Sequence, residues 1–228
     1  MATDALFARV VELADASVRR FEPAQLKWMW GEALYTYALD QLDNALGDDR
    51  YQPFNRAWLD AHIDKGYRVD QSDTMAPGLT AYALARKTGE ARYHAVVDRV
   101  VNYLKTADRV LDYMPNHLGS SPEGWLYPKS VWVDSVMMYG VYASWYGREA
   151  GDEEIYDFAR RQPELFARYL QDPEEKLFYH CYWTRSGHTY PRNKVFWGRG
   201  NGWVIAGLPM AIERSLRRHM SLCFGQPL

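Results

Sequence analysis

Two aspartates of this sequence, Asp73 and Asp134, stand among residues that suit general acid–base chemistry. Asp134 follows Trp132 inside an otherwise apolar run over residues 131–142, where a carboxylate is costly unless it is paired or used. Asp73 precedes another apolar segment, and on its own it could serve only as a helix N-cap. Two carboxyls beside aromatic rings can transfer protons, because burial raises the pKa of one while a polar neighbour keeps the other ionised.

A glycine-rich string with a tryptophan at each end, Trp197-Gly-Arg-Gly-Asn-Gly-Trp203, is a candidate for ligand binding. Its alternating glycines permit close backbone approach to a ligand, and Arg199 and Asn201 stand between them. The string lacks the Gly-Lys-Ser/Thr ending of a phosphate-binding loop, so it does not indicate a nucleotide. His180, in an aromatic stretch before the string, is compatible with a structural position or a cleft position.

The composition favours a carbohydrate cleft over other kinds of site. The 228 residues include 9 Trp and 17 Tyr, side chains whose flat apolar faces and polar edges suit such clefts. With 27 basic and 29 acidic residues the net charge is −2, without the basic excess that nucleic-acid binding needs. The 2 cysteines and 6 scattered histidines predict no metal site and no cofactor. The sequence shows neither a secretory signal nor a long apolar span, so we expect a cytoplasmic protein without a membrane partner.

The elements that must position these residues contain a short repeat. It occurs at residues 46–51, 88–93 and 150–156, each time with a glycine, then acidic residues, then a tyrosine. Glycine can take the left-handed conformation that ends one helix, and acidic residues suit the start of the next. The tyrosine is expected to be the first core residue of the second helix. Each repeat therefore predicts the turn of a helical hairpin.

The helices around these turns are of two kinds. Residues 90–107 are apolar on one face, whereas residues 28–42 and 131–146 are apolar on nearly every face. Inner helices wrapped by outer ones predict an all-α fold, the (α/α) toroid. We expect helices near residues 4–20, 25–46, 50–65, 76–87, 90–107, 131–149, 153–170 and 202–218, with Pro163 kinking or splitting the seventh.

The alternation predicts where the candidate residues meet. In a toroid all inner helices run in one direction, so their N-termini gather at one end. Asp73, Asp134 and the string at residues 197–203 each lie at the start of an inner helix, and we expect them to converge. Strand signals are few, and only residues 176–183 and 189–196 are expected to form a β-hairpin.

Four segments resemble, in order, the motifs of the unsaturated rhamnogalacturonyl hydrolases, glycoside hydrolase family 105. They are Ser72-Asp-Thr-Met-Ala-Pro-Gly78, Trp132-Val-Asp-Ser135, Leu177-Phe-Tyr-His180 and the string at residues 197–203. The resemblance implies an (α/α)6 barrel. It also implies an enzyme that hydrates the double bond of a 4,5-unsaturated uronic acid left at the end of an oligosaccharide by a pectin lyase, after which the sugar opens and releases the next residue.

The resemblance also implies roles for single residues. Asp134 matches the catalytic acid/base, which protonates C4 and takes a proton from the water that attacks C5. Asp73 matches the second aspartate, which helps to hold substrate and water. The expected substrate-binding residues are Trp132, His180, Trp197, Arg199, Asn201 and Trp203, with Arg199 suited to carboxylate groups by charge-assisted hydrogen bonding. The expected partner is a small oligosaccharide.

Two departures from the family pattern affect these expectations. Many members carry a histidine shortly before the Trp-x-Asp motif, but residues 123–129 contain none, and His117 does not fit the spacing. The second departure is length: six hairpins need about twelve helices, and we expect about eight. Residues 1–228 are therefore expected to form a single barrel domain without its C-terminal third, to expose apolar faces of the inner helices and to self-associate through them.

Other functions remain open from the sequence alone. One is an unsaturated glucuronyl hydrolase that acts on other lyase products. Another is a sugar epimerase on the same toroid, which would leave the double bond intact. A third is an inactive, truncated remnant of the enzyme.

Overall fold

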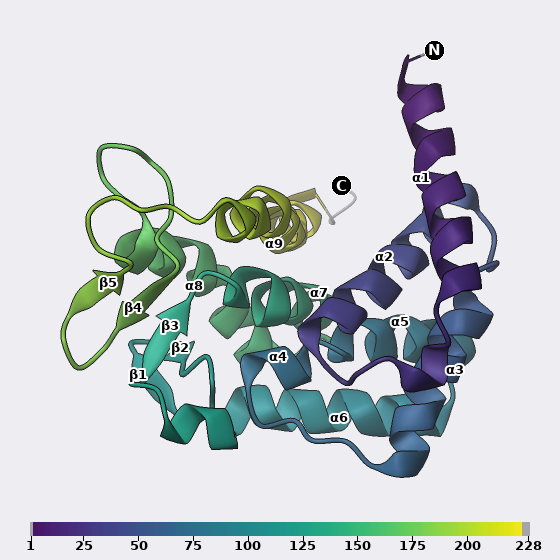
Figure 1. The fold of residues 1–228 in the computed structure, drawn as a ribbon, viewed down its shortest axis with the longest axis horizontal. Coiled ribbons are helices and arrows are strands. Elements are labelled where there is room, and N and C mark those ends of the chain that lie inside the picture. The colour runs from purple at the N-terminus through teal and green to yellow at the C-terminus, as the bar shows by residue number, and fades with distance from the viewer. Residues whose placement is uncertain (1, 225–228) are drawn as a thin grey trace. The chain divides into compact units, whose positions relative to one another are not determined.

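The computed structural model describes residues 2–224, with side chains from residue 5 to residue 214, and most of these residues are helical (Figure 1). The chain divides into two compact units, each described by itself below. Unit 1 comprises Met1–Arg68 and Pro77–Asp98, and unit 2 comprises Val69–Ala76 and Arg99–Leu228. Within the described residues, no helix combines the length and the hydropathy needed to cross a bilayer.

Unit 1 is built from helices joined by short turns. It contains α1 (Ala2–Arg20), a 3-10 turn (Pro23–Gln25), α2 (Trp30–Leu46), α3 (Gln52–Lys65), α5 (Gly78–Thr88) and the start of α6 (Ala91–Thr106). α2 packs against α3 and α5, and Trp58, Leu59 and Leu79 are completely buried. The hydroxyls of Thr36 and Thr80 lie 2.7 Å apart in a hydrogen bond between α2 and α5, so this contact leaves neither hydroxyl unpaired.

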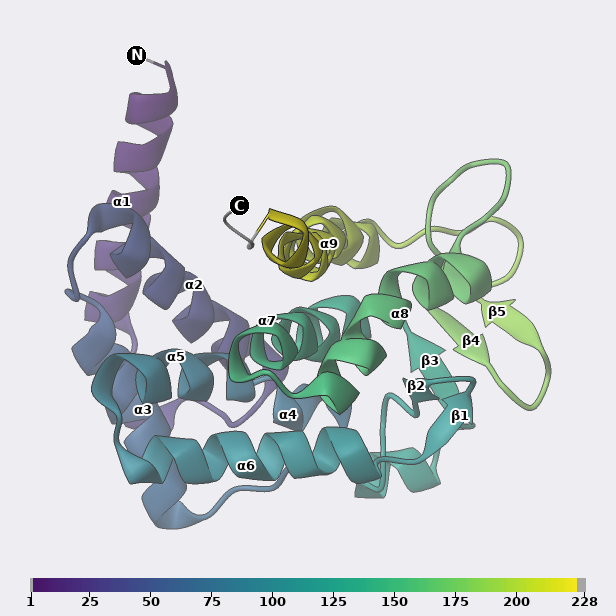
Figure 2. The same cartoon turned by 180° about the vertical axis from the view of Figure 1, so that it is seen from behind.

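Unit 2 combines helices with two small antiparallel sheets. It contains α4 (Ser72–Met75), the end of α6, β1 (Arg109–Leu111), β2 (Met114–Pro115), a 3-10 turn (Pro122–Trp125), β3 (Ser130–Trp132), a π-helical turn (Val136–Gly140), α7 (Val141–Ala150), α8 (Glu153–Leu170), β4 (Cys181–Trp183), β5 (His188–Tyr190) and α9 (Gly198–Phe224). α7 packs against α8 and α9, and the view from behind shows α7 beside α8 (Figure 2). The apolar residues of the π-helical turn and of α7 form the core of this unit.

The glycine turns predicted from the repeat are present at all three positions. Gly47, Gly89 and Gly151 each have a φ of 70°, and each ends a helix in the left-handed conformation. After the third turn, the carboxylate of Asp152 accepts a hydrogen bond of 3.1 Å from the backbone N–H of Ile155 and caps α8. The repeat is therefore a helix-ending turn, as its residues predict.

The tyrosine of the repeat follows the prediction in two copies of three. Tyr51 and Tyr93 are buried, with 2% and 0% exposure. In the third copy Ile155 is buried instead, and Tyr156 is only partly covered. That copy is one residue longer, so Ile155 takes the position of the first core residue.

A three-stranded sheet replaces the predicted hairpin in unit 2. β4 pairs with β5 in the expected antiparallel sense, with Cys181 opposite Tyr190. β3 adds to the other edge of β4, with Trp132 opposite Cys181. The helix expected from residue 131 therefore starts as a strand, because Trp132 pairs with β4, and helical geometry begins only after Asp134.

Other helix boundaries also differ from expectation. α2 begins at Trp30, after a separate 3-10 turn, rather than at residue 25. α8 runs without a break through Pro163. α9 begins at Gly198, so the glycine-rich string forms the first turns of a helix rather than a loop before one.

Candidate active site

Asp134 lies in the turn between β3 and the π-helical turn of unit 2. Its backbone carbonyl accepts hydrogen bonds from the N–H groups of Met137 at 3.0 Å and Met138 at 3.2 Å, so it opens the helical segment. One residue earlier in the chain, the N–H of Val133 donates a hydrogen bond of 2.8 Å to the carbonyl of His180. This backbone bond fixes the end of β3 against the start of β4, and it places Asp134 and His180 side by side.

The carboxyl of Asp134 faces the imidazole of His180. Its Oδ2 lies 3.4 Å from His180 Nε2, and Asp134 is only 7% exposed. Burial, the largest single influence, opposes the charged form of this carboxyl. The hydrogen-bonding capacity of His180 and the charges of His180 and His117 outweigh burial, and they hold the pKa of Asp134 below its ordinary value of 3.8.

Asp73 lies on α4, whose start is closed by a capping box. Gln71 is the N-cap, and the hydroxyl of Thr74 accepts the N–H of Gln71 at 3.2 Å. Asp73 Oδ1 lies 3.5 Å from Nε2 of His117. Burial is the main reason that the pKa of Asp73 is raised above its ordinary 3.8, and the negative charge of Asp134 adds to it while His117 opposes it.

His117 joins the two motifs that carry the aspartates. It is 1% exposed, and its Nδ1 lies 2.8 Å from the hydroxyl of Ser135, which in turn donates to the hydroxyl of Ser72 at 3.3 Å. Its backbone carbonyl accepts the N–H of Ser72 at 2.9 Å, and its own N–H donates to the carbonyl of Ser130 at 2.9 Å. His117 is therefore anchored to α4 and to β3 at once.

His117 lies in the candidate site although its spacing does not fit the family pattern. Residues 112–129 fold back so that His117 meets Asp73, although the spacing to Trp132 differs from the family pattern. The only signal in the sequence is a histidine inside a Pro- and Gly-rich loop that precedes Trp132. Burial lowers the pKa of His117, against the opposing charges of Asp73 and Asp134. The pKa values of Asp73 and His117 are thus both shifted toward the neutral form, whereas that of Asp134 is shifted toward the charged form.

Aromatic rings form a continuous line past the two carboxyls. Trp132 stacks on His117 with ring centres 4.4 Å apart and 8° between the planes, and it meets His180 edge-on at 4.8 Å. His180 in turn contacts Trp197 at 4.7 Å, and the guanidinium of Arg199 lies 4.3 Å above the Trp197 ring. Trp132, His180, Trp197 and Arg199, which come from three separate motifs, therefore lie together in unit 2.

The glycine-rich string contributes packing as well as side chains. A Cβ on Gly200 would lie 2.8 Å from Val133 and 2.8 Å from the ring of Trp197, so this glycine lets α9 approach the Trp-x-Asp segment. Gly198 and Gly202 have open space around them. Of the three glycines in the string, only Gly200 is required for a close approach, and that approach is to the segment after β3 of the protein itself rather than to a ligand.

Asn201 is engaged with the backbone. Its Oδ1 accepts the N–H of Phe178 at 2.8 Å, and its Nδ2 donates to the carbonyls of Phe178 at 2.9 Å and Trp197 at 3.1 Å. This amide ties the segment that leads to His180 onto the start of α9. Trp203, partly buried, follows one helical turn beyond Arg199.

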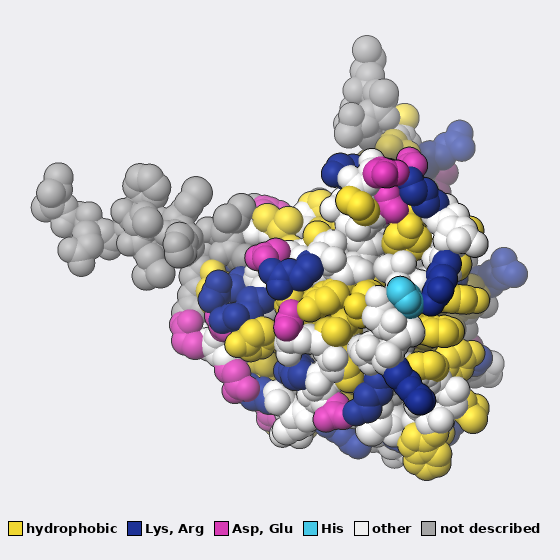
Figure 3. Space-filling view, turned by 90° about the vertical axis from the view of Figure 1, so that its left-hand side faces the viewer, with side chains coloured by type: hydrophobic (Ala, Val, Ile, Leu, Met, Phe, Trp, Pro, Cys, Tyr) yellow, Lys and Arg dark blue, Asp and Glu magenta, His cyan; other side chains and the backbone are white. Residues whose placement is uncertain are grey.

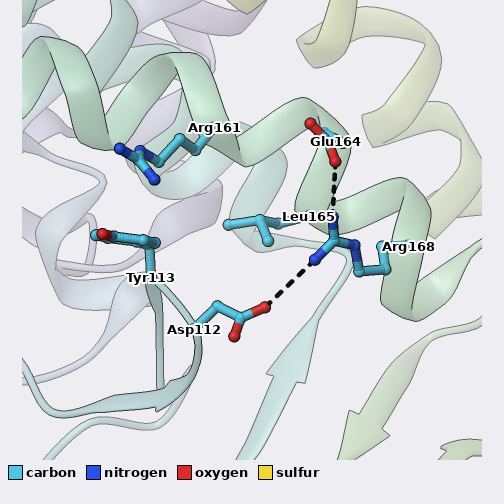
Figure 4. Close-up of a pocket in the computed structure, with 6 residues that line it drawn as sticks. All are labelled: Asp112, Tyr113, Arg161, Glu164, Leu165 and Arg168. Atoms are coloured by element: carbon cyan, nitrogen blue, oxygen red, sulfur yellow. Dashed lines mark hydrogen bonds and ion pairs between the residues drawn. The ribbon is translucent and has the colours of Figure 1, made fainter.

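A separate cavity of about 540 Å³ lies in unit 2 outside this group of residues. It is lined by Asp112, Tyr113, Arg161, Glu164, Leu165 and Arg168 (Figure 4). Arg168 pairs with Glu164 at 2.7 Å and with Asp112 at 3.7 Å, and Arg161 lies 4.2 Å above the ring of Tyr113. Its charges are thus paired internally, and none of the predicted site residues lines it. Among the described residues, no group of three or more His, Cys, Asp or Glu side chains is placed to hold a metal ion.

A buried carboxyl and a partly buried one, with opposite pKa shifts, lie beside stacked aromatic rings on a helical scaffold, which is the kind of site found in glycoside hydrolases. The family model described as Glycosyl Hydrolase Family 88 matches residues 7–219. The chain therefore belongs to this family.

Relatives and solved structures agree with the family. The chain is 26% identical over 205 residues to the unsaturated rhamnogalacturonyl hydrolase YesR of Bacillus subtilis, a match that covers 90% of this chain and 59% of that protein. It is 30% identical over 90 residues to the unsaturated 3S-rhamnoglycuronyl hydrolase of an Alteromonas species, covering 40% of this chain and 22% of that protein. The predicted resemblance to unsaturated rhamnogalacturonyl hydrolases is confirmed.

The structural comparison confirms the fold class. A family 105 glycoside hydrolase of C. acetobutylicum superposes with a TM-score of 0.77 and 21% identity, over 92% of this chain and 60% of the other. A possible family 105 member from Klebsiella pneumoniae superposes with a TM-score of 0.74 and 22% identity, over 82% of this chain and 48% of the other. The all-helical (α/α) toroid class is thus as predicted. The chain spans 59% of the length of the YesR protein, and a single domain over residues 1–228 stays a prediction.

Proposed function

We propose that this chain carries the proton-transfer site of an enzyme that hydrates the 4,5 double bond of an unsaturated uronyl residue at the end of an oligosaccharide. The observation that carries the proposal is the pair of carboxyls with separate histidine partners, Asp134 with His180 and Asp73 with His117. Relatives named as unsaturated rhamnogalacturonyl and rhamnoglycuronyl hydrolases support the same reaction class. The substrate proposed first is a lyase product of rhamnogalacturonan.

The reaction adds one water across a vinyl ether. A carboxylic acid delivers a proton to C4, and the ring oxygen stabilises the positive charge that develops at C5. Water attacks C5 and gives its proton to a carboxylate. The C5–O bond of the resulting hemiketal breaks, which leaves a hemiacetal at C1, and this hemiacetal expels the next sugar as an alcohol.

The electrostatics of the free site favour a division of the two proton transfers. The sequence-based assignment gives both to Asp134. However, the pKa of Asp73 is raised and that of Asp134 is lowered, so of the two carboxyls Asp73 binds a proton more readily and Asp134 gives one up more readily. Two neighbouring carboxyls whose environments push their pKa values apart are an acid and a base. We therefore propose Asp73 as the donor to C4 and Asp134 as the acceptor of the proton from water.

The remaining residues hold the substrate. Trp132 and Trp197 offer apolar ring faces on either side of His180. Arg199, above Trp197, suits the carboxylate of the uronyl group. Asn201 acts on the substrate only through His180 and Trp197, because its amide is bonded to the backbone beside them. Trp203 is proposed to line the cleft further along α9.

The test is loss of the ultraviolet absorbance of the conjugated double bond when the protein is mixed with unsaturated rhamnogalacturonan disaccharide. The proposal expects the absorbance to fall and free rhamnose to appear. A changed sugar with unchanged absorbance would indicate an epimerase and contradict the proposal. If an unsaturated chondroitin disaccharide is turned over faster than the rhamnogalacturonan disaccharide, the substrates are lyase products of glycosaminoglycans instead.

A further inference from the structure

An exposed aromatic surface lies beside the candidate site in unit 2. Trp125 is 82% exposed, Leu126 85% and Tyr127 55%, an unusual amount of apolar surface on three successive residues. Hydrophobic side chains lie next to Lys and Arg on the face shown in Figure 3. We refer to residues 125–129 as the aromatic loop.

The aromatic loop is held in place by hydrogen bonds. The preceding 3-10 turn is capped by Ser121, whose hydroxyl accepts the N–H of Gly124 at 3.3 Å. At its other end, the carbonyl of Lys129 accepts both the N–H of Thr184 at 3.1 Å and the hydroxyl of Thr184 at 2.9 Å. The exposed rings are therefore presented by an anchored turn, which lowers the entropy lost when a ligand binds.

A hollow separates the aromatic loop from the turn between β4 and β5. Its volume is about 510 Å³, and it is lined by Trp125, Leu126, Tyr127, Pro128, Lys129, Thr184 and Arg185. This size is within the range of sites that bind small ligands, about 300–1,000 Å³. The combination of flat aromatic faces and basic side chains suits a sugar that carries a carboxylate.

One ring contact links the hollow to the candidate active site. The ring of Tyr127 meets the ring of Trp132 edge-on, with centres 6.4 Å apart. Trp132 also contacts His180, the partner of Asp134. An oligosaccharide whose terminal uronyl residue lies at Asp134 can therefore continue past Trp132 onto the aromatic loop.

The basic side chains of the hollow complement an acidic oligosaccharide. Arg185 is exposed, and no described residue forms an ion pair with it. Lys129 pairs with Asp108 at 2.6 Å, a solvent-exposed ion pair that contributes little and can be exchanged for a ligand. Galacturonate units beyond the reacting residue carry carboxylates, and such a carboxylate could form the ion pair that no described residue forms with Arg185.

We propose that the aromatic loop and Arg185 form a binding site for the sugars that follow the reacting uronyl residue, so that the protein prefers acidic oligosaccharides longer than a disaccharide. This inference rests on the proposed function for the position of the reacting end. Trp125 and Tyr127 stack on sugar rings, and Arg185 binds a galacturonate carboxylate.

The experiment compares a disaccharide and a tetrasaccharide of unsaturated rhamnogalacturonan. For Trp125→Ala we expect kcat/KM on the tetrasaccharide to fall about tenfold, which is about 1.4 kcal/mol, with little change on the disaccharide. Arg185→Gln is expected to give a similar loss that shrinks at high salt. Arg192→Gln, an exposed arginine of the same region, and Tyr113→Ala, a half-exposed tyrosine of the separate cavity, are the matched controls and should change neither substrate.

A second readout separates this inference from the proposed function. Calorimetric affinity for a saturated rhamnogalacturonan tetrasaccharide, which has no double bond to react, should also fall about tenfold in Trp125→Ala. If turnover is absent but this affinity falls, the hydration reaction is refuted and the binding site stands. If Trp125→Ala lowers kcat/KM equally on the disaccharide and the tetrasaccharide, or on neither, the binding site is refuted. Loss of a dimer in Trp125→Ala, with unchanged affinity, would show that the loop is a self-association surface and overturn the inference.

Discussion

The two aspartates of the candidate site have different histidine partners, and their pKa values are shifted in opposite directions. His180 is partly exposed and lies against Asp134, whose pKa is lowered. His117 is completely buried and lies against Asp73, whose pKa is raised. Burial is the largest influence on both carboxyls: at Asp73 it prevails and raises the pKa, whereas at Asp134 the hydrogen bond of His180 and the nearby imidazole charges outweigh it and the pKa is lowered.

Asp134→Asn is expected to remove activity and to leave the fold intact. The amide keeps the size of the side chain but can neither accept nor deliver a proton, so kcat should fall at least ~10²-fold. Ultraviolet turnover assays and circular dichroism measure the two effects. Asp98→Asn, at an exposed carboxyl on α6, is the control and should retain activity. Near-normal turnover by the Asp134 variant would refute the assignment.

The pH dependence of kcat/KM distinguishes one catalytic carboxyl from two. If Asp73 must be protonated, activity falls as pH rises through its pKa, which lies above the ordinary 3.8. If Asp134 must be charged, activity also falls as pH drops through its pKa, which lies below 3.8. We therefore expect a bell-shaped profile whose high-pH limb lies above 3.8. If activity instead falls as pH rises through a pKa below 3.8, the group that must be protonated is Asp134, and both transfers belong to it.

Among the elements, the long loop positions His117 through one close backbone contact. Gly119 has a φ of 52°, and the N–H of Ser120 donates to the carbonyl of Asp70 at 2.9 Å. A Cβ on Gly119 would lie 2.0 Å from that carbonyl oxygen and 2.8 Å from the hydroxyl of Tyr103. The loop therefore lies against the segment that leads into α4 only because this residue is glycine.

Gly119→Ala is expected to destabilise the protein and to displace His117. Left-handed geometry alone costs a non-glycine residue about 1–2 kcal/mol, and here the backbone overlap adds to it. Gly151→Ala is the matched control, because its φ is 70° and nothing lies within 4 Å of an added Cβ. We expect the control to lose stability only, whereas Gly119→Ala also loses activity. Equal thermal shifts and equal activities for the two variants would contradict this account.

Asn201→Ala tests whether this amide positions the segment before His180. Its removal leaves the N–H and carbonyl of Phe178 without their partner, at about 1–3 kcal/mol for buried groups. We expect lower thermal stability together with a lower kcat, because His180 is no longer fixed against Asp134. A variant that raises KM alone would indicate that Asn201 contacts the substrate directly.

The elements also show what the sequence can and cannot predict. Helices and glycine turns follow from local signals, since Gly47, Gly89 and Gly151 need only their own conformation. β3 has three residues and is defined by its pairing with β4, so apolar residues 131–149 are indistinguishable from a helix in sequence. The contact of His117 with Asp73 depends on how a long loop folds back, which no local pattern encodes.

At the scale of the whole molecule, the chain covers only part of the YesR relative, and unit 1 has exposed apolar surface. The chain spans 59% of the YesR protein. On α1, Leu6 is 66% exposed and Leu13 71%. An apolar groove of about 360 Å³ is lined by Val10, Leu13, Ala14, Ser17, Phe21, Tyr35, Ala38, Leu39 and Leu42. Surface of this kind is usually covered by another helix or another molecule.

We expect the isolated 228-residue chain to self-associate through this surface and to be marginally stable. Each Leu-sized side chain left in water forgoes about 1.5–3 kcal/mol, and several of them approach the 5–15 kcal/mol that stabilises a domain. Light scattering and thermal melting measure both properties. Leu6→Glu and Leu13→Glu, two helical turns apart on one face, should reduce association, whereas Ala8→Glu, the same added charge at an exposed site on the opposite side of the helix, should not. A monomeric wild-type chain with a sharp, cooperative melt would show that the apolar face of α1 needs no partner.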